Sequence, residues 1–442
     1  MKKVIKDILN FIKNEYLEQW AFILLFFWVI SPLVEYIFKN YCESLYTYYF
    51  SFITYIIGLF GIITYIVYII KNKEKRKWSI KKFIPEILIA ILVIIAIIAS
   101  ILSKNTHLSI FGESYRKEGL LVYIMYIGFI LLASIIKDTK YLKLLLKSII
   151  ASCLVITIIP LFKSDFTYVG FANVFHQFNH YGYYLMINIM LSVFMFMDSS
   201  KLFKKIIYLL IYIFLTYLLI RNDTFGCFLA IAITFFFLFL YSMIKKYKRM
   251  DVIIVILLFI ITSFTVSHFD IKIGERVNFK STQGLVGNNL STFTKDVKSI
   301  VDKDDKGTNK AGTGRGLLWK EAINYTIDHP IIGGGMESLN SYYFLRNVKY
   351  NDRPHNIILQ ISSFIGIPGA IIYLVLILYL ALTNLKIMKQ NTIHIMVYFT
   401  AMCYFISSIF GNSMYYTSPY FMILLGLLIG FNRERKEIRL TK

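Results

Sequence analysis

The sequence predicts an all-α polytopic membrane protein, and three observations lead to that prediction. Of the 442 residues, 57% are apolar and only 17% are charged, whereas a soluble domain carries about 25% charged residues. The mean hydropathy is +0.61. The apolar runs are long and show no polar–apolar alternation, so they do not fit the strands of a membrane barrel. Since only helices and closed barrels satisfy the backbone inside lipid, the runs are predicted to be helices.

This composition excludes a cytosolic enzyme, a secreted disulfide-stabilised domain and a nucleic-acid-binding protein. The four cysteines, Cys42, Cys153, Cys227 and Cys403, have no CxxC or metal-ligand spacing, and the last three lie in apolar segments. Neither a disulfide framework nor a metal site is expected.

A transmembrane helix needs about 20 mostly apolar residues, and twelve segments meet this requirement. The predicted spans are residues 20–38, 47–70, 83–102, 119–136, 146–162, 181–197, 204–220, 224–244, 251–267, 356–382, 393–410 and 415–431. The basic N-terminal segment is not followed by a short apolar region with a cleavage site, so the first apolar segment is interpreted as a retained span.

Lysine and arginine in the loops predict the orientation of these spans. With the N-terminus inside, the inner segments hold 29 of these residues and the short outer loops hold 6. Both termini are therefore expected in the cytoplasm. The net charge of +22 is mainly a topology signal, combined with attraction to anionic lipid.

The same orientation divides the chain into three parts. Residues 1–267 form spans one to nine, residues 268–355 form a large extracytoplasmic loop, and residues 356–442 form spans ten to twelve with a basic cytoplasmic tail. Residues 281–314 of the loop are polar and expected to be weakly ordered. From Leu317 the apolar residues have helical spacing, which predicts a helix. This helix is followed by a triple-glycine turn at 333–335 and by a short amphipathic segment around Leu339–Leu345.

Polar residues gather on the predicted outer face, while the spans hold almost no charged residues away from their ends. A proton- or sodium-coupled transporter would normally carry a carboxylate near the middle of the membrane, so that class is disfavoured. The outer candidates are Arg116, Asn179, His180, Arg221, Arg315, Arg353, His355 and Asn356.

Arginines that converge at an interface suit a ligand of dense negative charge, because guanidinium binds phosphate oxygens bidentately and stays protonated. Arg315 begins a predicted helix, whose free N–H groups also favour an anion. A histidine among arginines would stay neutral and could accept a proton. This is the arrangement that transfer from a diphosphate requires.

Each candidate also has a structural interpretation. Arg116 and Arg221 could be interfacial anchors. For Arg353, a solvated loop charge is the preferred interpretation over a ligand-binding role. His355 could cap span ten, and His176 and His180 fit interfacial packing better than catalysis. The glycines at 333–335 are more typical of a turn than of a phosphate-binding loop.

One stretch resembles a known family. It reads GRGLLWKEAINYTIDHPIIGGGMESLN, followed by RPHNIILQISSFIGIPGAI, and it is similar to the signature of the O-antigen ligase and polymerase superfamily. The matching positions are Arg315, Trp319, Pro330, Gly333, Gly335, His355, Asn356 and Gly366. SIFGESYRKEGLL and FNHYGYYL resemble outer elements of the family, and Arg221 lies where the family has an arginine at a helix start.

The resemblance implies a metal-independent, inverting glycosyltransferase of the GT-C-like membrane type, without a cofactor. Its donor would be an oligosaccharide on a polyprenyl (undecaprenyl) diphosphate at the outer face of the cytoplasmic membrane. Arg221 and Arg315 would bind the diphosphate and His355 would act as general base. Arg116, Asn179, Trp319, Asn356 and Arg353 are the further substrate-binding candidates, and the acceptor would be a sugar or lipid hydroxyl.

Three other functions remain open, one of which is a purely structural or sensor role. A flippase or exporter of lipid-linked oligosaccharide would share the twelve spans, although duplicated halves and a polar midplane path are not seen. A peptidoglycan-polymerase-like enzyme would use an acidic loop residue, such as Asp270 or Glu275. The sequence does not distinguish ligase from polymerase, and it does not identify the sugar or the oligomeric state.

Overall fold

The computed structural model describes residues 14–41, 49–72, 83–113, 116–161, 173–175, 177–269, 284–301, 315–345, 353–388, 391–412 and 414–440. Throughout these ranges the regular elements are helices, and no sheet is formed. Asp270, Glu275, His176 and Cys42, which the sequence analysis considered, lie outside the described residues.

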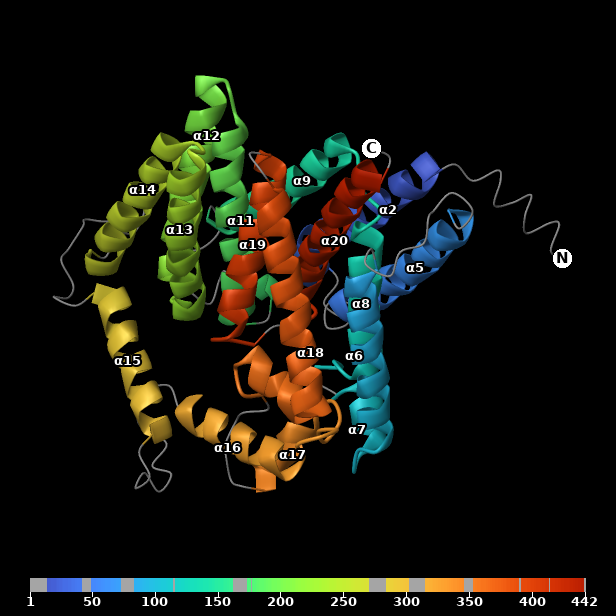
Figure 1. Ribbon diagram of the computed structural model, residues 1–442. Coiled ribbons are helices and arrows are strands. Elements are labelled where there is room, and N and C mark those ends of the chain that lie inside the picture. Colours follow the sequence, from blue (N-terminus) through green and yellow to red (C-terminus); the bar gives the residue numbers. More distant parts are fainter. Residues whose placement is uncertain are drawn as a thin grey trace.

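The helices follow one another along the chain as shown in Figure 1. In the first half they are α2 (Asn14–Val29), α3 (Ser31–Tyr41), α5 (Tyr49–Lys71), α6 (Ile84–Ile101), α7 (Thr106–Phe111), α8 (Leu120–Ala133), α9 (Thr139–Leu161), the 3-10 turn η2 (Asn173–Phe175) and α11 (Phe178–Asp198). In the second half they are α12 (Leu202–Arg221), α13 (Phe225–Lys245), α14 (Arg249–His268), α15 (Gly284–Val301), α16 (Arg315–Asp328), α17 (Ser338–Leu345), α18 (Ile357–Ile387), α19 (Thr392–Ser408) and α20 (Ser418–Leu440).

All twelve predicted spans coincide with a helix or a helix pair. Within the described ranges, eight helices are long and apolar enough to cross a membrane, and the pair α2–α3, bent by 41°, would make nine. The shorter apolar helices α8, α19 and α20 occupy the other three predicted spans. The 14 residues of α8 extend about 21 Å, less than the roughly 30 Å hydrocarbon core. The all-α membrane architecture is confirmed, and the count of twelve stays a prediction.

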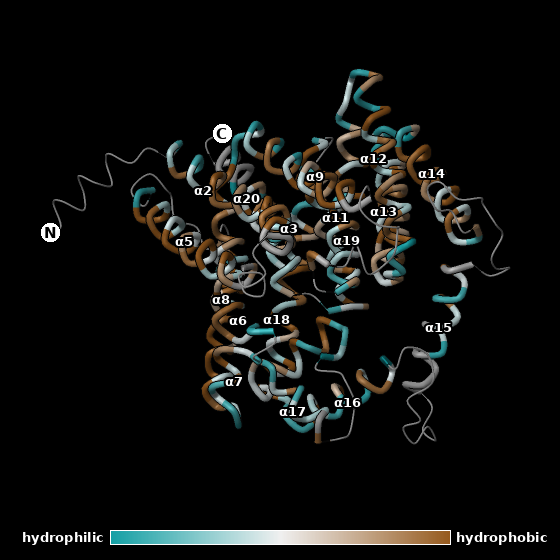
Figure 2. Tube along the Cα trace, turned by 180° about the vertical axis from the view of Figure 1, so that it is seen from behind, coloured by the Kyte–Doolittle hydropathy of each residue, from teal (hydrophilic) through white to brown (hydrophobic). Residues whose placement is uncertain are grey.

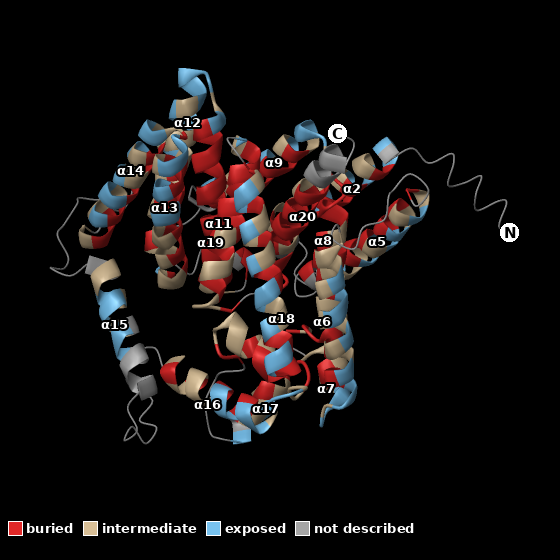
Figure 3. Ribbon diagram, in the orientation of Figure 1, coloured by how far each residue is buried: buried red, intermediate tan, exposed pale blue. Residues whose placement is uncertain are grey.

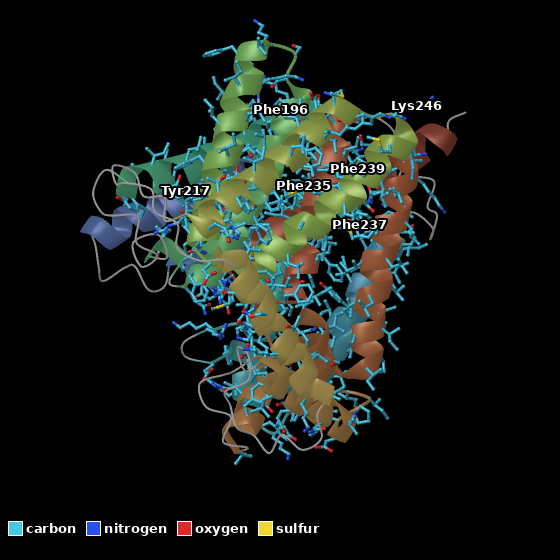
Figure 4. The ribbon with its side chains drawn as sticks, turned by 90° about the vertical axis from the view of Figure 1, so that its left-hand side faces the viewer. Phe196, Tyr217, Phe235, Phe237, Phe239 and Lys246 are labelled. Carbon is cyan, nitrogen blue, oxygen red and sulfur yellow. The ribbon has the colours of Figure 1, made fainter. Side chains whose placement is uncertain are left out.

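The centre of the molecule is α11, which is buried along almost its whole length (Figure 3). It packs against α9, α12, α13 and α19. Outer helices instead expose apolar side chains, and Figure 2 shows them as predominantly hydrophobic. On α13, for example, Phe235 is buried while Phe237 is 53% exposed (Figure 4). Exposed apolar faces around a buried helix are what a lipid environment requires.

The helices α15, α16 and α17 of the long loop lie together at one end of the molecule (Figure 1). The helix over 315–328 and the short helix at 338–345 agree with the sequence prediction. The prediction of weak order over 281–314 is wrong for residues 284–301, because α15 forms there. Contacts with α13, α14 and α16 hold this helix, and the Val286 amide donates to the Ser267 hydroxyl (3.0 Å).

The triple-glycine segment is a turn that packs against a break in α18. At Ile365 and Gly366 the backbone leaves helical geometry. The carbonyl groups of Ser363 and Phe364, in the turn before this break, accept hydrogen bonds from the amides of Gly334 and Gly335, both at 3.0 Å. Gly366 has φ +77°, and a Cβ there would lie 2.3 Å from the Ile331 carbonyl oxygen. The turn amides are therefore used to attach the loop to α18 and are not free for phosphate.

Candidate functional site

Arg315 is the first residue of α16 and lines a polar pocket of about 200 Å³. Its Nη1 donates to the Phe410 carbonyl oxygen (3.0 Å), just beyond the end of α19. Asn179, in the first turn of α11, lines the same pocket. The remaining lining residues are Phe178, Tyr183, Asp223, Thr224, Phe225, Gly226, Cys227, Asn289, Thr292, Ser407, Phe410 and Gly411. Two sequence candidates that are 136 positions apart thus meet in one polar pocket.

Arg221 is the last residue of α12, directly before the tight turn that forms one wall of this pocket. The Asn222 side-chain amide donates to the Phe178 carbonyl oxygen (2.8 Å) and to the Thr224 hydroxyl (2.6 Å). These bonds fix the end of α12 against the start of α11. Arg221, the second candidate diphosphate-binding arginine, does not itself line the pocket but lies two residues before the lining residue Asp223.

Asp223 supplies an acidic group to the same wall, and the sequence analysis did not single it out. Its φ of +56° places it in the left-handed region. The Asn289 amide of α15 donates to its carboxylate. Burial raises the pKa of Asp223, and the bond from Asn289 opposes that rise. This contact brings α15 over the pocket.

His355 lies before α18 with φ +52°, an uncommon backbone conformation for a residue with a side chain. Its Nε2 lies 3.3 Å from the Asn412 side-chain nitrogen, and Asn412 follows the pocket residue Gly411. The Asn412 amide nitrogen donates to Nε2 in the tautomer that leaves this ring nitrogen unprotonated. That tautomer, a neutral imidazole with an unprotonated Nε2, is the one that a general base needs. Asn412 is a partner that the sequence analysis missed.

The interpretation of Arg353 as a solvated loop charge is wrong, because its side chain is completely buried. Its Nη1 donates to Glu118 (2.7 Å) and its Nη2 donates to Glu337. The Tyr126 hydroxyl donates to Glu118 as well. The segments of Glu118 and Glu337, 235 and 16 positions away, thus meet at this arginine, which stands two residues before His355.

Arg116 belongs to the same charged cluster and does not line the polar pocket. It is buried, and its positive charge acts on Glu337. Burial raises the pKa of Glu337, while the charges of Arg353 and Arg116 oppose that rise. Two arginines and two carboxylates thus balance inside the protein, as buried charges must.

Trp319 and Asn356 do not line the polar pocket. The Asn356 side-chain oxygen accepts from the amides of Ile358 and Leu359 (2.9 and 3.1 Å), so Asn356, and not His355, caps α18. Trp319 packs on a small core formed by α16, α17 and α18. Its buried indole N–H has no acceptor among the described residues.

The described residues contain no group of three or more His, Cys, Asp or Glu side chains that could hold a metal ion. The three described cysteines, Cys153, Cys227 and Cys403, are free and buried. His180 is buried and lies against Tyr416, with ring centroids 5.4 Å apart, in agreement with its interpretation as a packing residue.

Residues 206–374 match the family model described as O-antigen ligase. This region of the chain is similar to the O-antigen ligase family. The matched region runs from α12 into α18 and contains Arg221, Arg315, Trp319, Arg353, His355 and Asn356. No curated protein matches the chain.

The O-antigen ligase region and the remainder of the chain both contribute to the candidate site. The pocket arginine Arg315 and the turn with Asp223 lie inside the match, whereas Asn179 and Asn412 lie outside it. The O-antigen ligase family implies a glycosyltransferase-like membrane enzyme that joins glycans in surface-polysaccharide biosynthesis.

Proposed function

We propose that the protein transfers a glycan from a polyprenyl (undecaprenyl) diphosphate carrier to a sugar or lipid hydroxyl at the outer face of the cytoplasmic membrane. The observation that carries this proposal is the polar pocket at the start of α16, which Arg315 lines. Arg221 lies two residues before the lining residue Asp223. Asn412, which contacts His355, directly follows the lining residue Gly411. Both termini are cytoplasmic in this proposal, as the charge distribution of the loops predicts.

The donor diphosphate binds at Arg315 and Arg221. Guanidinium groups pair with phosphate oxygens and remain charged, and the N–H groups in the first turn of α16 add further donors. These groups compensate the negative charge that develops on the leaving diphosphate, so the reaction needs no metal. The role is electrostatic, and removal of one such contact typically costs about 10²–10³ in rate.

The acceptor hydroxyl reacts beside His355. The hydroxyl oxygen attacks the anomeric carbon, the bond from that carbon to the diphosphate oxygen breaks, and the hydroxyl proton passes to Nε2 of His355. The carrier leaves as its diphosphate anion. Attack from the side opposite to the leaving group in one displacement inverts the anomeric centre. Asn412 keeps the imidazole oriented before the acceptor arrives.

The test uses the purified full chain in detergent, with a polyprenyl-diphosphate-linked oligosaccharide and a chelator in place of added metal. Carrier release and glycan length are followed for the wild type, His355→Ala and Arg315→Ala. We expect both variants to lose at least about a hundredfold in rate. His329→Ala is the matched control, because His329 bonds the Tyr325 carbonyl group and lies outside the pocket.

Two readouts decide between the alternatives. A ladder of products would indicate a polymerase, and a single addition to an acceptor would indicate a ligase. If His355→Ala and Arg315→Ala fold and retain wild-type rates, the transferase proposal fails, and movement of the lipid-linked oligosaccharide across a vesicle membrane should then be measured.

A further inference from the structure

A second polar cavity lies at the other end of α11 from the candidate site. It has a volume of about 340 Å³ and is formed by the first turns of α9, the end of α11 and the start of α12. Four lysines line it, two on α9 (Lys143 and Lys147) and two at the start of α12 (Lys201 and Lys204). No residue of the proposed glycan-transfer site takes part.

The charge of this cavity is not balanced by the protein. Its one carboxylate, Asp198, lies 2.9 Å from Nζ of Lys143. Lys147, Lys201 and Lys204 form no ion pair within the described part of the chain. Three positive charges therefore face one cavity, an arrangement that favours an anionic ligand.

The rim of the cavity is apolar and exposed. Ile207 lines the cavity, and its neighbours on α12, Leu202 and Phe203, are each 73% exposed. On α9, Leu144 is 46% exposed between the two cavity lysines. A free inorganic anion would gain nothing from this surface, whereas the acyl chains of a lipid would cover it.

The position in the fold matches a membrane interface. The 21 residues of α11 run from the polar pocket at Phe178 to the basic cavity at Asp198, and a helix of this length spans about 30 Å, the thickness of the hydrocarbon core. Phe196, next to the cavity residue Met195, and Lys246 at the end of α13 lie towards the same end of the molecule (Figure 4). The two cavities thus lie one membrane thickness apart.

We propose that the basic cavity binds the phosphate group of an anionic phospholipid, with Lys147, Lys201 and Lys204 around the phosphate. The acyl chains lie along the exposed apolar side chains of α12. Basic cavities between membrane helices recognise lipid headgroups in this way, because a lysine supplies a point charge at the headgroup level. The site holds a resident lipid of the leaflet opposite the glycan-transfer pocket and is independent of catalysis.

The test uses delipidated full-length protein under three conditions. Two are mixed micelles that contain phosphatidylglycerol or phosphatidylcholine, and the third is detergent with inorganic phosphate and no added lipid. Thermal unfolding and native mass spectrometry report binding to the wild type and to the double variant Lys147→Gln/Lys204→Gln. The control, Lys245→Gln/Lys386→Gln, removes the same charge from exposed lysines near the ends of α13 and α18 that do not line the cavity.

Phosphatidylglycerol should raise the unfolding temperature of the wild type and of the control, and bind the cavity variant at least about tenfold more weakly. Phosphatidylcholine and inorganic phosphate should have little effect. An equal response of the cavity variant and the control would overturn the proposed site. Equal stabilisation by inorganic phosphate and phosphatidylglycerol would show a free-anion site and overturn the lipid assignment.

Discussion

At the residue scale, the most consequential side chain is Arg353, which pairs with Glu118 and Glu337 in a fully buried position. A buried ion pair gains little over an apolar core, but the loss of one partner leaves a charge without compensation. The cluster joins the segment before α8, the turn before α17 and the segment before α18. It therefore fixes the backbone two residues from His355.

Arg353→Ala should strongly destabilise the fold, because two buried carboxylates lose their shared cation. We expect a loss of about 3–5 kcal/mol in the free energy of unfolding, measured by chemical denaturation in detergent. Arg353→Lys, which keeps a charge but not the bidentate geometry, should lose less. An unfolding free energy of Arg353→Ala equal to that of the wild type would contradict the buried cluster.

Glu337 should make stability depend on pH. Burial raises its pKa in the folded state above the ordinary value of 4.5, so the fold disfavours the ionised form. The contribution of Glu337 to the free energy of unfolding is therefore most favourable below pH 4.5, and it is lost as the pH rises through the raised pKa. Melting temperatures measured across this range should therefore fall more with rising pH in the wild type than in Glu337→Gln. Parallel pH profiles would show that Glu337 does not titrate there.

At the element scale, the break in α18 is the feature that positions the long loop. The turn after α16 closes on this break through backbone bonds to Ser363 and Phe364, and the Ile367 amide donates to the Pro330 carbonyl group (2.8 Å). The loop is attached to a membrane helix through its main chain. A change in the break should thus affect the loop helices before it affects the distant spans.

Gly366→Ala tests this attachment. The new Cβ would lie 2.3 Å from the Ile331 carbonyl oxygen at a φ of +77°, and we expect a cost of about 1–3 kcal/mol. Hydrogen exchange should show α16 and α17 opening, while α11 stays protected. Gly226→Ala in α13 is the control, because its Cβ would meet no atom closer than 3.3 Å. Unchanged exchange in α16 and α17 would contradict this account.

At the scale of the whole molecule, the two ends of the bundle differ in chemistry. One end carries the loop helices and the polar pocket, and the other carries the lysine-lined cavity between α9 and α12. The helices between them expose apolar side chains. We propose that the two cavities lie on opposite sides of one bilayer.

Cysteine labelling tests this placement. In a Cys42→Ser background the three other cysteines are buried, so a membrane-impermeant maleimide should report only an introduced thiol. We expect Lys320→Cys in α16 to react in intact cells, and Lys204→Cys in α12 to react only after permeabilisation. Reaction of Lys204→Cys in intact cells would reverse the proposed orientation.

The sequence by itself determined the membrane class, the places of the helices and the residues of the O-antigen ligase signature. These properties depend on local hydropathy, charge counts and motif spacing, which do not require knowledge of the packing. It also located the helix at Arg315 and the glycine turn, because helical periodicity and turn residues act over a few positions.

Only the tertiary structure decided which charges meet. Arg353 was interpreted as a loop charge because its partners are not local: Glu118 lies 235 positions away and Glu337 lies 16 positions away. The segment of α15 was predicted to be weakly ordered because its stabilising contacts come from α13, α14 and α16. Asn412 and Asp223 carried no local signal for the same reason. Burial and pairing are long-range properties that arise when the helices pack, and the division between polar pocket, charged cluster and lysine cavity follows from that packing.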